Sequence, residues 1–307
     1  MTGGRSLRIG RGPLRATVAT TGATLVHAES GGHPVLSGPG RVAPELGHHG
    51  AVLAPWPNRT GRGRYEFDGV RHQLPVDDAA YGHAIHGFAY AREWRVDRHT
   101  PDEVSLSLEL RDEPGYPFHI GLSVGYRATP DTLRCEARWS NLGRGDAPFG
   151  IGFHPYLLPG PSALDRWLLE VPADTVLDVD PATALPTRLL QASGTEFDFR
   201  TARPVGTAAF SRAFGALRRT DGHATVRVTD PERFTLQMEV SAAFGWVQVF
   251  TGDLPDPRHR RRGLAVEPQT CPPNALATGQ DLLRLRPGRA GTAWWRLRVS
   301  QPYVYPS

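Results

Sequence analysis

Short segments in which apolar and polar residues alternate recur along the whole chain, and most of them end at glycine, proline or an Asp-Gly pair. Alternation with a period of two is typical of a strand with one buried face, whereas an amphipathic helix repeats every 3.6 residues. No segment of the sequence shows a sustained helical period. The pattern therefore predicts an all-β fold, a large antiparallel β-sandwich in which helix is confined to short turns.

The clearest predicted strands come in pairs around turn signals. Asp68-Gly69 separates Tyr65–Phe67 from Val70–Leu74 and predicts a type I′ hairpin. Further antiparallel pairs are predicted for 94–96 with 104–110 and for 120–126 with 133–139. The remaining predicted strands are 14–18, 23–26, 167–171, 224–228, 234–240, 246–250, 264–267 and 292–299. Residues 180–223 show the least regular pattern, with one short helix expected near Pro204–Phe210.

The 34 glycines and 28 prolines are spread evenly over the 307 residues, so no linker divides the chain. Sandwiches of this length occur as one unit, and we expect a single domain over residues 1–307. A hydrophobic content of 39% and a charged content of 21% are typical of a soluble globular protein. Because no apolar run is long enough to span a bilayer and the N-terminus lacks a signal-peptide core, we expect a cytoplasmic protein without membrane contact.

The charge pattern does not favour a nucleic-acid partner. All 35 basic residues are arginine, and along most of the chain they are interleaved with Asp and Glu. The only basic run, Arg258–Arg262, is interpreted first as a solvated loop. The two cysteines, Cys135 and Cys271, lie far apart in the sequence and are expected to be reduced thiols in a cytosolic chain.

One carboxylate, Glu267, lies in a segment whose backbone is restricted by prolines. The run Leu264–Val266 leads into Glu267, and Pro268 biases Glu267 toward extended backbone geometry while Pro272 and Pro273 stiffen the exit. This arrangement suits a carboxylate that acts as a base. Taken alone it is equally compatible with an ordinary turn in which the carboxylate is solvated or bonds to the backbone.

Three histidines stand in comparably restricted positions. His154 follows an apolar strand and precedes Pro155, and His86 lies between Ile85 and Gly87. His83 and His86 are three residues apart and would point to opposite faces of an extended segment, so they make a poor metal site. We therefore expect a single functional His86, with His83 a helper or a bystander, and no bound metal.

Other polar residues could bind a ligand. Asn58-Arg59 lies between prolines and glycines, where a rigid loop could present the planar donors of arginine to a hydroxylated or anionic ligand. A structural salt bridge is the alternative for Arg59. Gln248 would share a strand face with Trp246 and Phe250, an odd place for an amide unless it binds a ligand or the backbone. The sequence contains no phosphate-binding glycine loop, Gly-x-Ser-x-Gly elbow or clustered zinc pattern, which leaves acid–base chemistry by a carboxylate and imidazoles.

Four motifs in order resemble the aldose 1-epimerases, or galactose mutarotases. They are Asn58-Arg59 with Gly61 and Gly63, Ile85-His86-Gly87-Phe88, Gly152-Phe153-His154-Pro155-Tyr156, and Val266-Glu267-Pro268 with Pro273-Asn274. Order and approximate spacing agree from about residue 15 to residue 298. The resemblance implies a β-supersandwich and the interconversion of α and β anomers of a free aldose without a cofactor. It implies a monosaccharide ligand, while the sequence leaves open whether the protein is a monomer or a homodimer.

The resemblance also implies roles for single residues. Glu267 would be the general base and His154 the general acid, while Arg59, His86 and Gln248 would bind sugar hydroxyls, with Asn58 beside them. One position departs from the family. Ser211 aligns with a sugar-binding aspartate of the family, so the resemblance does not fix the preferred sugar.

Three other functions stay open at the level of sequence. A hexose-6-phosphate 1-epimerase of the same fold would use the basic run Arg258–Arg262. A carbohydrate-binding or sugar-sensing protein would keep the pocket but turn nothing over. A metal-dependent sugar isomerase would bring His83, His86, His154 and Glu267 to one ion.

Overall fold

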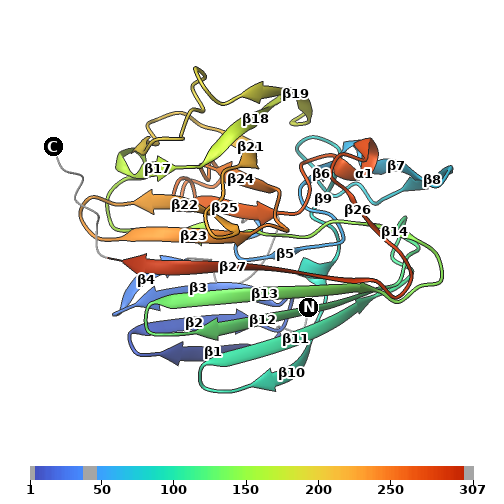
Figure 1. The fold of residues 1–307 in the computed structure, drawn as a ribbon, viewed down its shortest axis with the longest axis horizontal. Coiled ribbons are helices and arrows are strands. Elements are labelled where there is room, and N and C mark those ends of the chain that lie inside the picture. The colour runs from blue at the N-terminus through green and yellow to red at the C-terminus, as the bar shows by residue number, and fades with distance from the viewer. Residues whose placement is uncertain (1–3, 37–46, 301–307) are drawn as a thin grey trace.

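Two large antiparallel sheets form the body of the protein, as the computed structural model shows for residues 4–36 and 47–300 (Figure 1). The first sheet has 12 strands, of which ten follow one path: β1 (Ser6–Arg11), β2 (Leu14–Ala19), β3 (Thr24–Ser30), β4 (His33–Leu36), β16 (Tyr156–Leu157), β25 (Leu264–Gln269), β24 (Trp246–Phe250), β21 (Ser211–Leu217), β18 (Ala173–Val179) and β19 (Pro186–Gln191). The two others are β15 (Gly152–Phe153), which pairs with β25, and β5 (Val52–Leu53), which pairs with β15.

The second sheet has nine strands in the order β10 (Arg95–His99), β11 (Glu103–Leu110), β12 (Ile120–Ala128), β13 (Thr132–Asn141), β27 (Ala290–Ser300), β23 (Thr235–Ser241), β22 (His223–Thr229), β17 (Leu168–Glu170) and β20 (Arg203–Pro204). Three small pairs are β6 (Arg59–Thr60) with β9 (Ala84–Ile85), β7 (Arg64–Phe67) with β8 (Val70–Gln73), and β14 (Ala147–Phe149) with β26 (Leu283–Leu285). Helical structure in the described ranges is limited to α1 (Ala275–Thr278) and the 3₁₀ turns η2 (Gly61–Gly63), η3 (Ala89–Ala91) and η4 (Leu164–Arg166). The predicted all-β antiparallel sandwich is confirmed.

The hairpin around Asp68-Gly69 forms as the sequence predicts. Both residues have positive φ, 51° and 76°, which is the backbone signature of a type I′ turn. β7 and β8 pair directly across it, with Phe67 opposite Val70. The predicted pairs β10–β11 and β12–β13 are confirmed as well.

The expected helix near Pro204–Phe210 is wrong. The backbone N–H groups of this segment are bound by neighbouring loops instead of by carbonyls four residues earlier. Val205 donates to the Trp167 carbonyl, Gly206 donates to the Asp165 carbonyl, and Phe210 donates to the Thr251 hydroxyl. Strands β19, β20 and β21 also lie within 180–223, where the sequence showed no clear pattern.

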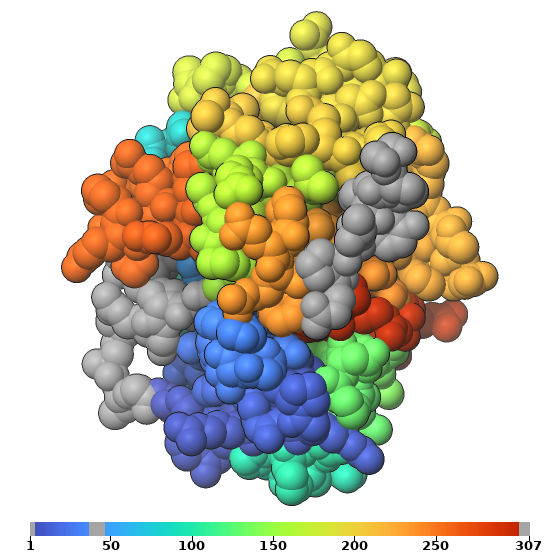
Figure 2. Space-filling view, turned by 90° about the vertical axis from the view of Figure 1, so that its left-hand side faces the viewer, coloured from blue at the N-terminus to red at the C-terminus, as the bar shows by residue number. Residues whose placement is uncertain are grey.

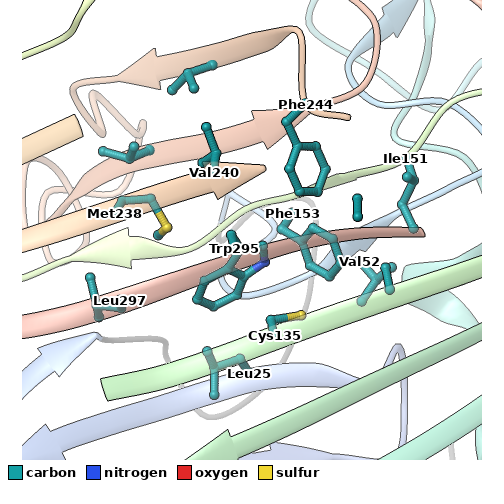
Figure 3. Close-up of a cluster of buried hydrophobic side chains, with 14 of the residues drawn as sticks. Leu25, Val52, Cys135, Ile151, Phe153, Met238, Val240, Phe244, Trp295 and Leu297 are labelled. Carbon is teal, nitrogen blue, oxygen red and sulfur yellow. The ribbon is translucent and has the colours of Figure 1, made fainter. Parts of the chain in front are cut away.

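One buried hydrophobic cluster joins the facing sides of the two sheets (Figure 3). Trp295 of β27 lies at its centre, with ring contacts to Tyr126 at 6.4 Å and to Phe153 at 5.9 Å. Phe153 belongs to β15 of the first sheet and immediately precedes His154. The core therefore anchors the backbone that presents this histidine.

The first sheet crosses the whole molecule. In Figure 2 its N-terminal strands (blue) lie in the lower part and the segments around β18 and β19 (yellow) in the upper part. Near its middle, β25 is buried along all six residues. The small pairs β6–β9 and β7–β8 lie with α1 at one end of the sandwich (Figure 1). Within the ranges described, no helix is long and apolar enough to cross a membrane.

Candidate active site

Glu267 lies in the interior of a strand. β25 continues past Pro268 to Gln269, so the carboxylate does not mark a strand end as its proline neighbour had indicated. In the register of β24 and β25, Glu267 is directly opposite Gln248, which places both side chains on the same face of the sheet. The Gln248 amide donates to the Ser211 hydroxyl of β21 at 2.7 Å. The sequence therefore brings a carboxylate, an amide and a hydroxyl together across three neighbouring strands.

His154 reaches the same place from the turn between β15 and β16. Its backbone is fixed on both sides, since its N–H donates to Ala51 and its carbonyl accepts from Gly50. The Nε2 atom lies 3.3 Å from Oε1 of Glu267. The imidazole ring stacks on Tyr156, with 5.1 Å between centroids and an interplanar angle of 9°. These contacts fix the orientation of the ring toward the carboxylate.

His86 is bonded to Asn58 through two hydrogen bonds. The His86 N–H donates to the Asn58 carbonyl at 3.0 Å, and the Asn58 N–H donates to Nδ1 of His86 at 3.1 Å. Because Nδ1 accepts, the hydrogen of the neutral ring is on Nε2. Both residues have left-handed backbone geometry, with φ of 64° and 58°. The His86 ring contacts the His154 ring at 5.4 Å.

Arg59 follows Asn58 and lies opposite Ile85 in the β6–β9 pair. Its Nε donates to Asp78 at 2.7 Å, and its guanidinium lies 4.9 Å from the centroid of the Tyr81 ring. The structural salt bridge weighed for Arg59 is therefore present. Its side chain keeps 19% exposure, so the ion pair with Asp78 does not bury it completely.

Burial controls the protonation of the catalytic candidates. Glu267 is 2% exposed, and this burial raises the pKa of its carboxyl to about 8. Burial lowers the pKa of His154 and of His86 well below the ordinary value, and the neighbouring His48 adds to both shifts. The site thus disfavours isolated charges and favours a neutral pairing of carboxylic acid with imidazole.

The aldose 1-epimerase family model matches residues 5–298, which is nearly the whole chain. The chain belongs to the aldose 1-epimerase family. It is 34% identical over 288 residues to the uncharacterized protein YihR of Escherichia coli, with 93% of this chain and 90% of that protein covered. It is 26% identical over 266 residues to the aldose 1-epimerase of the same organism, with 78% and 76% covered.

The present protein has the same fold as a solved structure of a galactose mutarotase-like protein from Clostridium acetobutylicum. The two align with a TM-score of 0.83 at 16% identity, covering 97% of this chain and 96% of the other. At this level of identity the likeness supports the architecture alone.

Several site residues of this epimerase-family protein were missed by sequence reasoning. His48 contacts the His86 ring at 4.6 Å, and burial lowers its pKa to about 4. His49 stacks on Tyr156 at 3.7 Å, on the ring that also supports His154. Asp78, which bonds Arg59, was missed too. The sequence feature that could have indicated these histidines is the doublet His48-His49 between two glycines. Its position beside β9 depends on the fold.

His83 is a structural residue and not a partner of Glu267. Its Nδ1 accepts the Arg62 N–H at 3.0 Å, and its Nε2 bonds the Thr183 carbonyl at 2.8 Å. Both ring nitrogens are therefore occupied by backbone. This removes His83 from the four-ligand set of a metal-dependent isomerase. No group of three or more metal-ligating side chains occurs within the described ranges.

The arginines of the basic run Arg258–Arg262 mostly bond acceptors within the protein. Arg258 bonds Asp256, and Arg260 donates to the Leu254 carbonyl at 2.9 Å. Arg261 is the best-connected member, with bonds to Asp165 at 2.6 Å and to the Gly206 carbonyl at 2.7 Å. Three arginines of the run thus shape the loop before β25 instead of forming an open anion site.

Proposed function

We propose that this protein is an aldose 1-epimerase that interconverts the α and β anomers of a free aldose by acid–base ring opening and reclosure. The observation that carries the proposal is the 3.3 Å approach of Oε1 of Glu267 to Nε2 of His154 in a buried site. A base and an acid at this separation can bracket the C1–O5 bond of a cyclic sugar. The family membership supports the same reaction.

Ring opening moves two protons. The Glu267 carboxylate takes the proton of the anomeric hydroxyl, and the C1 oxygen becomes a carbonyl as the C1–O5 bond breaks. The electron pair of that bond goes to O5, which takes a proton from the His154 imidazolium. After rotation about C1–C2, His154 takes the O5 proton back, O5 attacks the other face of C1, and Glu267 returns its proton. Neither a metal nor a covalent intermediate is needed.

The two groups share one proton in the working enzyme. At neutral pH the burial-raised pKa of Glu267 and the lowered pKa of His154 place this proton on the carboxyl. Its transfer to His154 gives the carboxylate and imidazolium that the reaction requires, without any exchange with solvent. Activity should fall above about pH 8, where the pair loses its shared proton, and at low pH, where the pair gains a second one.

The surrounding polar groups suit a hydroxylated ligand. His86 carries its hydrogen on Nε2, because Nδ1 accepts the Asn58 N–H. The Gln248 carbonyl oxygen is buried and has no hydrogen-bond partner among the described residues, since the amide nitrogen binds Ser211. A buried acceptor without a partner is costly, and a sugar hydroxyl would satisfy it. Arg59 would donate to further sugar oxygens, and the Asn58 side chain shapes the turn by accepting the Arg59 N–H.

Polarimetry tests the proposal. Freshly dissolved α-D-glucose, α-D-galactose and other aldoses are followed in the presence of the wild type, and we expect exchange faster than the uncatalysed rate for at least one. Glu267→Gln and His154→Asn should each lower the rate by about 10³-fold or more, because each removes one of the two proton carriers. Unchanged rates in both variants would refute the assignment of the pair.

Assays with a panel of sugars also distinguish the proposed function from two alternatives, a sugar-binding protein without activity and a hexose-6-phosphate epimerase. A sugar-binding protein would be stabilised thermally by an aldose without accelerating anomer exchange. A hexose-6-phosphate epimerase would prefer glucose 6-phosphate to glucose, with a preference that weakens as the salt concentration rises. Because Arg258, Arg260 and Arg261 already bond acceptors of the protein itself, we expect no such preference.

A further inference from the structure

We propose that Gln269 is a positioning residue that holds one oxygen of Glu267 and thereby selects the other oxygen as the base. This inference rests on the proposed function and adds a residue to its machinery. Gln269 follows Glu267 by two positions in β25, so both side chains point to the same face of the sheet. The Gln269 side chain is fully buried, with 0% exposure.

The two oxygens of Glu267 have different partners. The Gln269 amide nitrogen donates to Oε2 at 3.1 Å. Oε1 faces Nε2 of His154 at 3.3 Å. A carboxylate can rotate about its terminal torsion, which is a soft, two-fold motion. The hydrogen bond from Gln269 restricts this rotation, so Oε1 stays directed toward the proton that passes between the sugar and the pair.

Room for this amide is created on the neighbouring strand. Gly152 of β15 lies directly opposite Gln269 in the register of β15 and β25. A Cβ atom at Gly152 would lie 3.0 Å from Cγ of Gln269 and 3.0 Å from Cβ of Pro57. The absence of a side chain at position 152 therefore allows Gln269 to lie in the position from which it reaches Glu267.

The hydrogen bond from Gln269 also affects the ionisation of Glu267. Donation of a hydrogen bond to a carboxylate stabilises its ionised form, so Gln269 opposes the effect of burial on Glu267. The amide is neutral and cannot exchange a proton with the pair. Gln269 can thus favour the carboxylate–imidazolium arrangement without competing for the proton. The Arg59 charge also lowers the pKa of Glu267, and it acts through charge alone.

Kinetics of Gln269→Leu test the proposal on the full-length protein. We expect kcat to fall by about 10- to 100-fold, the loss that a misplaced reacting group commonly causes, while KM changes little. The alkaline limb of the profile of kcat/KM against pH should move to higher pH, because the carboxylate has lost its donor. A uniform loss at every pH with an unmoved limb, or no loss at all, would overturn the proposal.

A second variant guards against a packing effect at position 269. Gly152→Ala keeps the Gln269 amide but adds a Cβ that crowds its Cγ, so a fall in kcat and a shift of the limb in the same direction are expected. Thermal denaturation identifies any variant that does not fold, and Gln269→Met then replaces Gln269→Leu because it keeps an unbranched side chain.

An infrared titration separates this inference from the proposed function. The carboxylic acid band of Glu267 is identified by its loss in Glu267→Gln, and its midpoint in the wild type is compared with that in Gln269→Leu. We expect a higher midpoint in the variant, whether or not any aldose is turned over. An unmoved midpoint would overturn the role of Gln269. If the midpoint is higher in Gln269→Leu than in the wild type but the wild type exchanges no anomers, only the proposed reaction is overturned.

Discussion

The middle of the first sheet is built differently from the long strands of the second sheet, although the two sheets share one core. In the second sheet β11, β12, β13 and β27 have 8 to 11 residues each, and buried positions mostly alternate with more exposed ones. In the first sheet β5, β15 and β16 have two residues each, and β25 is buried on both faces. Long alternating strands bury one face against the core, whereas short strands let loops bring polar groups inside. The site lies where the alternation is broken.

Left-handed backbone geometry recurs around the site, as it does in tight turns elsewhere in the chain. Around the site, His48, Asn58 and His86 are non-glycine residues with φ of 52°, 58° and 64°. Such left-handed conformations are costly for residues with a Cβ and are found at functional sites when surrounding contacts enforce them. Polar side chains differ as well: Glu267 and Gln248 are buried, while Arg138 and Glu136 pair on the outer face of β13 in contact with solvent.

The largest expected effect on stability comes from the core of the second sheet. Leu106 of β11 is fully buried, so Leu106→Ala should lower the free energy of unfolding by about 2 to 5 kcal/mol, which chemical denaturation measures. Anomer exchange per folded molecule should stay within about twofold, because no site residue lies on β11. The matched control is Ser107→Ala on the other face of the strand. A catalytic loss in Leu106→Ala as large as that in Glu267→Gln would contradict the separation of a stabilising second sheet from a catalytic region in the first.

A smaller effect of opposite sign is expected at Glu267. Its folded pKa of about 8 lies above the ordinary glutamate pKa of about 4.5, so the folded state binds the proton more tightly and stability is lost as pH rises from about 4.5 to 8. Glu267→Gln removes this penalty. The variant should exceed the wild type by about 1 to 3 kcal/mol at pH 9 and by much less at pH 5. Equal differences at both pH values would mean that the carboxyl is not perturbed.

The smallest effect is expected in the loop before β25. Arg261 joins this loop to the Asp165 carboxylate and the Gly206 carbonyl, so Arg261→Ala should cost about 1 to 2 kcal/mol. Arg258→Ala is the control, because Arg258 is exposed and bonds only the nearby Asp256 carboxylate among the residues described. Thermal denaturation of both variants should show a decrease for the first and no measurable change for the second. The reverse ranking would contradict the structural role of Arg261.

Much of the architecture could be predicted from the sequence for a physical reason. Alternation with a period of two reports which face of a strand is buried, and a turn such as Asp68-Gly69 specifies its own backbone geometry. The segment Pro204–Phe210 shows the limit of this reasoning. Its backbone hydrogen bonds go to residues distant in sequence, Trp167, Asp165 and Thr251, so no local pattern could reveal its conformation.

The candidate site divides in the same way. Proline and glycine neighbours limit the chain locally, so the restricted backbone positions of Glu267, His154, His86 and Arg59 can be recognised from the sequence. The bonds of His83 to backbone groups, the contact of His48 with His86 and the hydrogen bond from Gln269 to Glu267 follow from the fold. These facts depend on strand register and loop packing, which join residues far apart in the chain, and on burial, which sets the pKa of the pair.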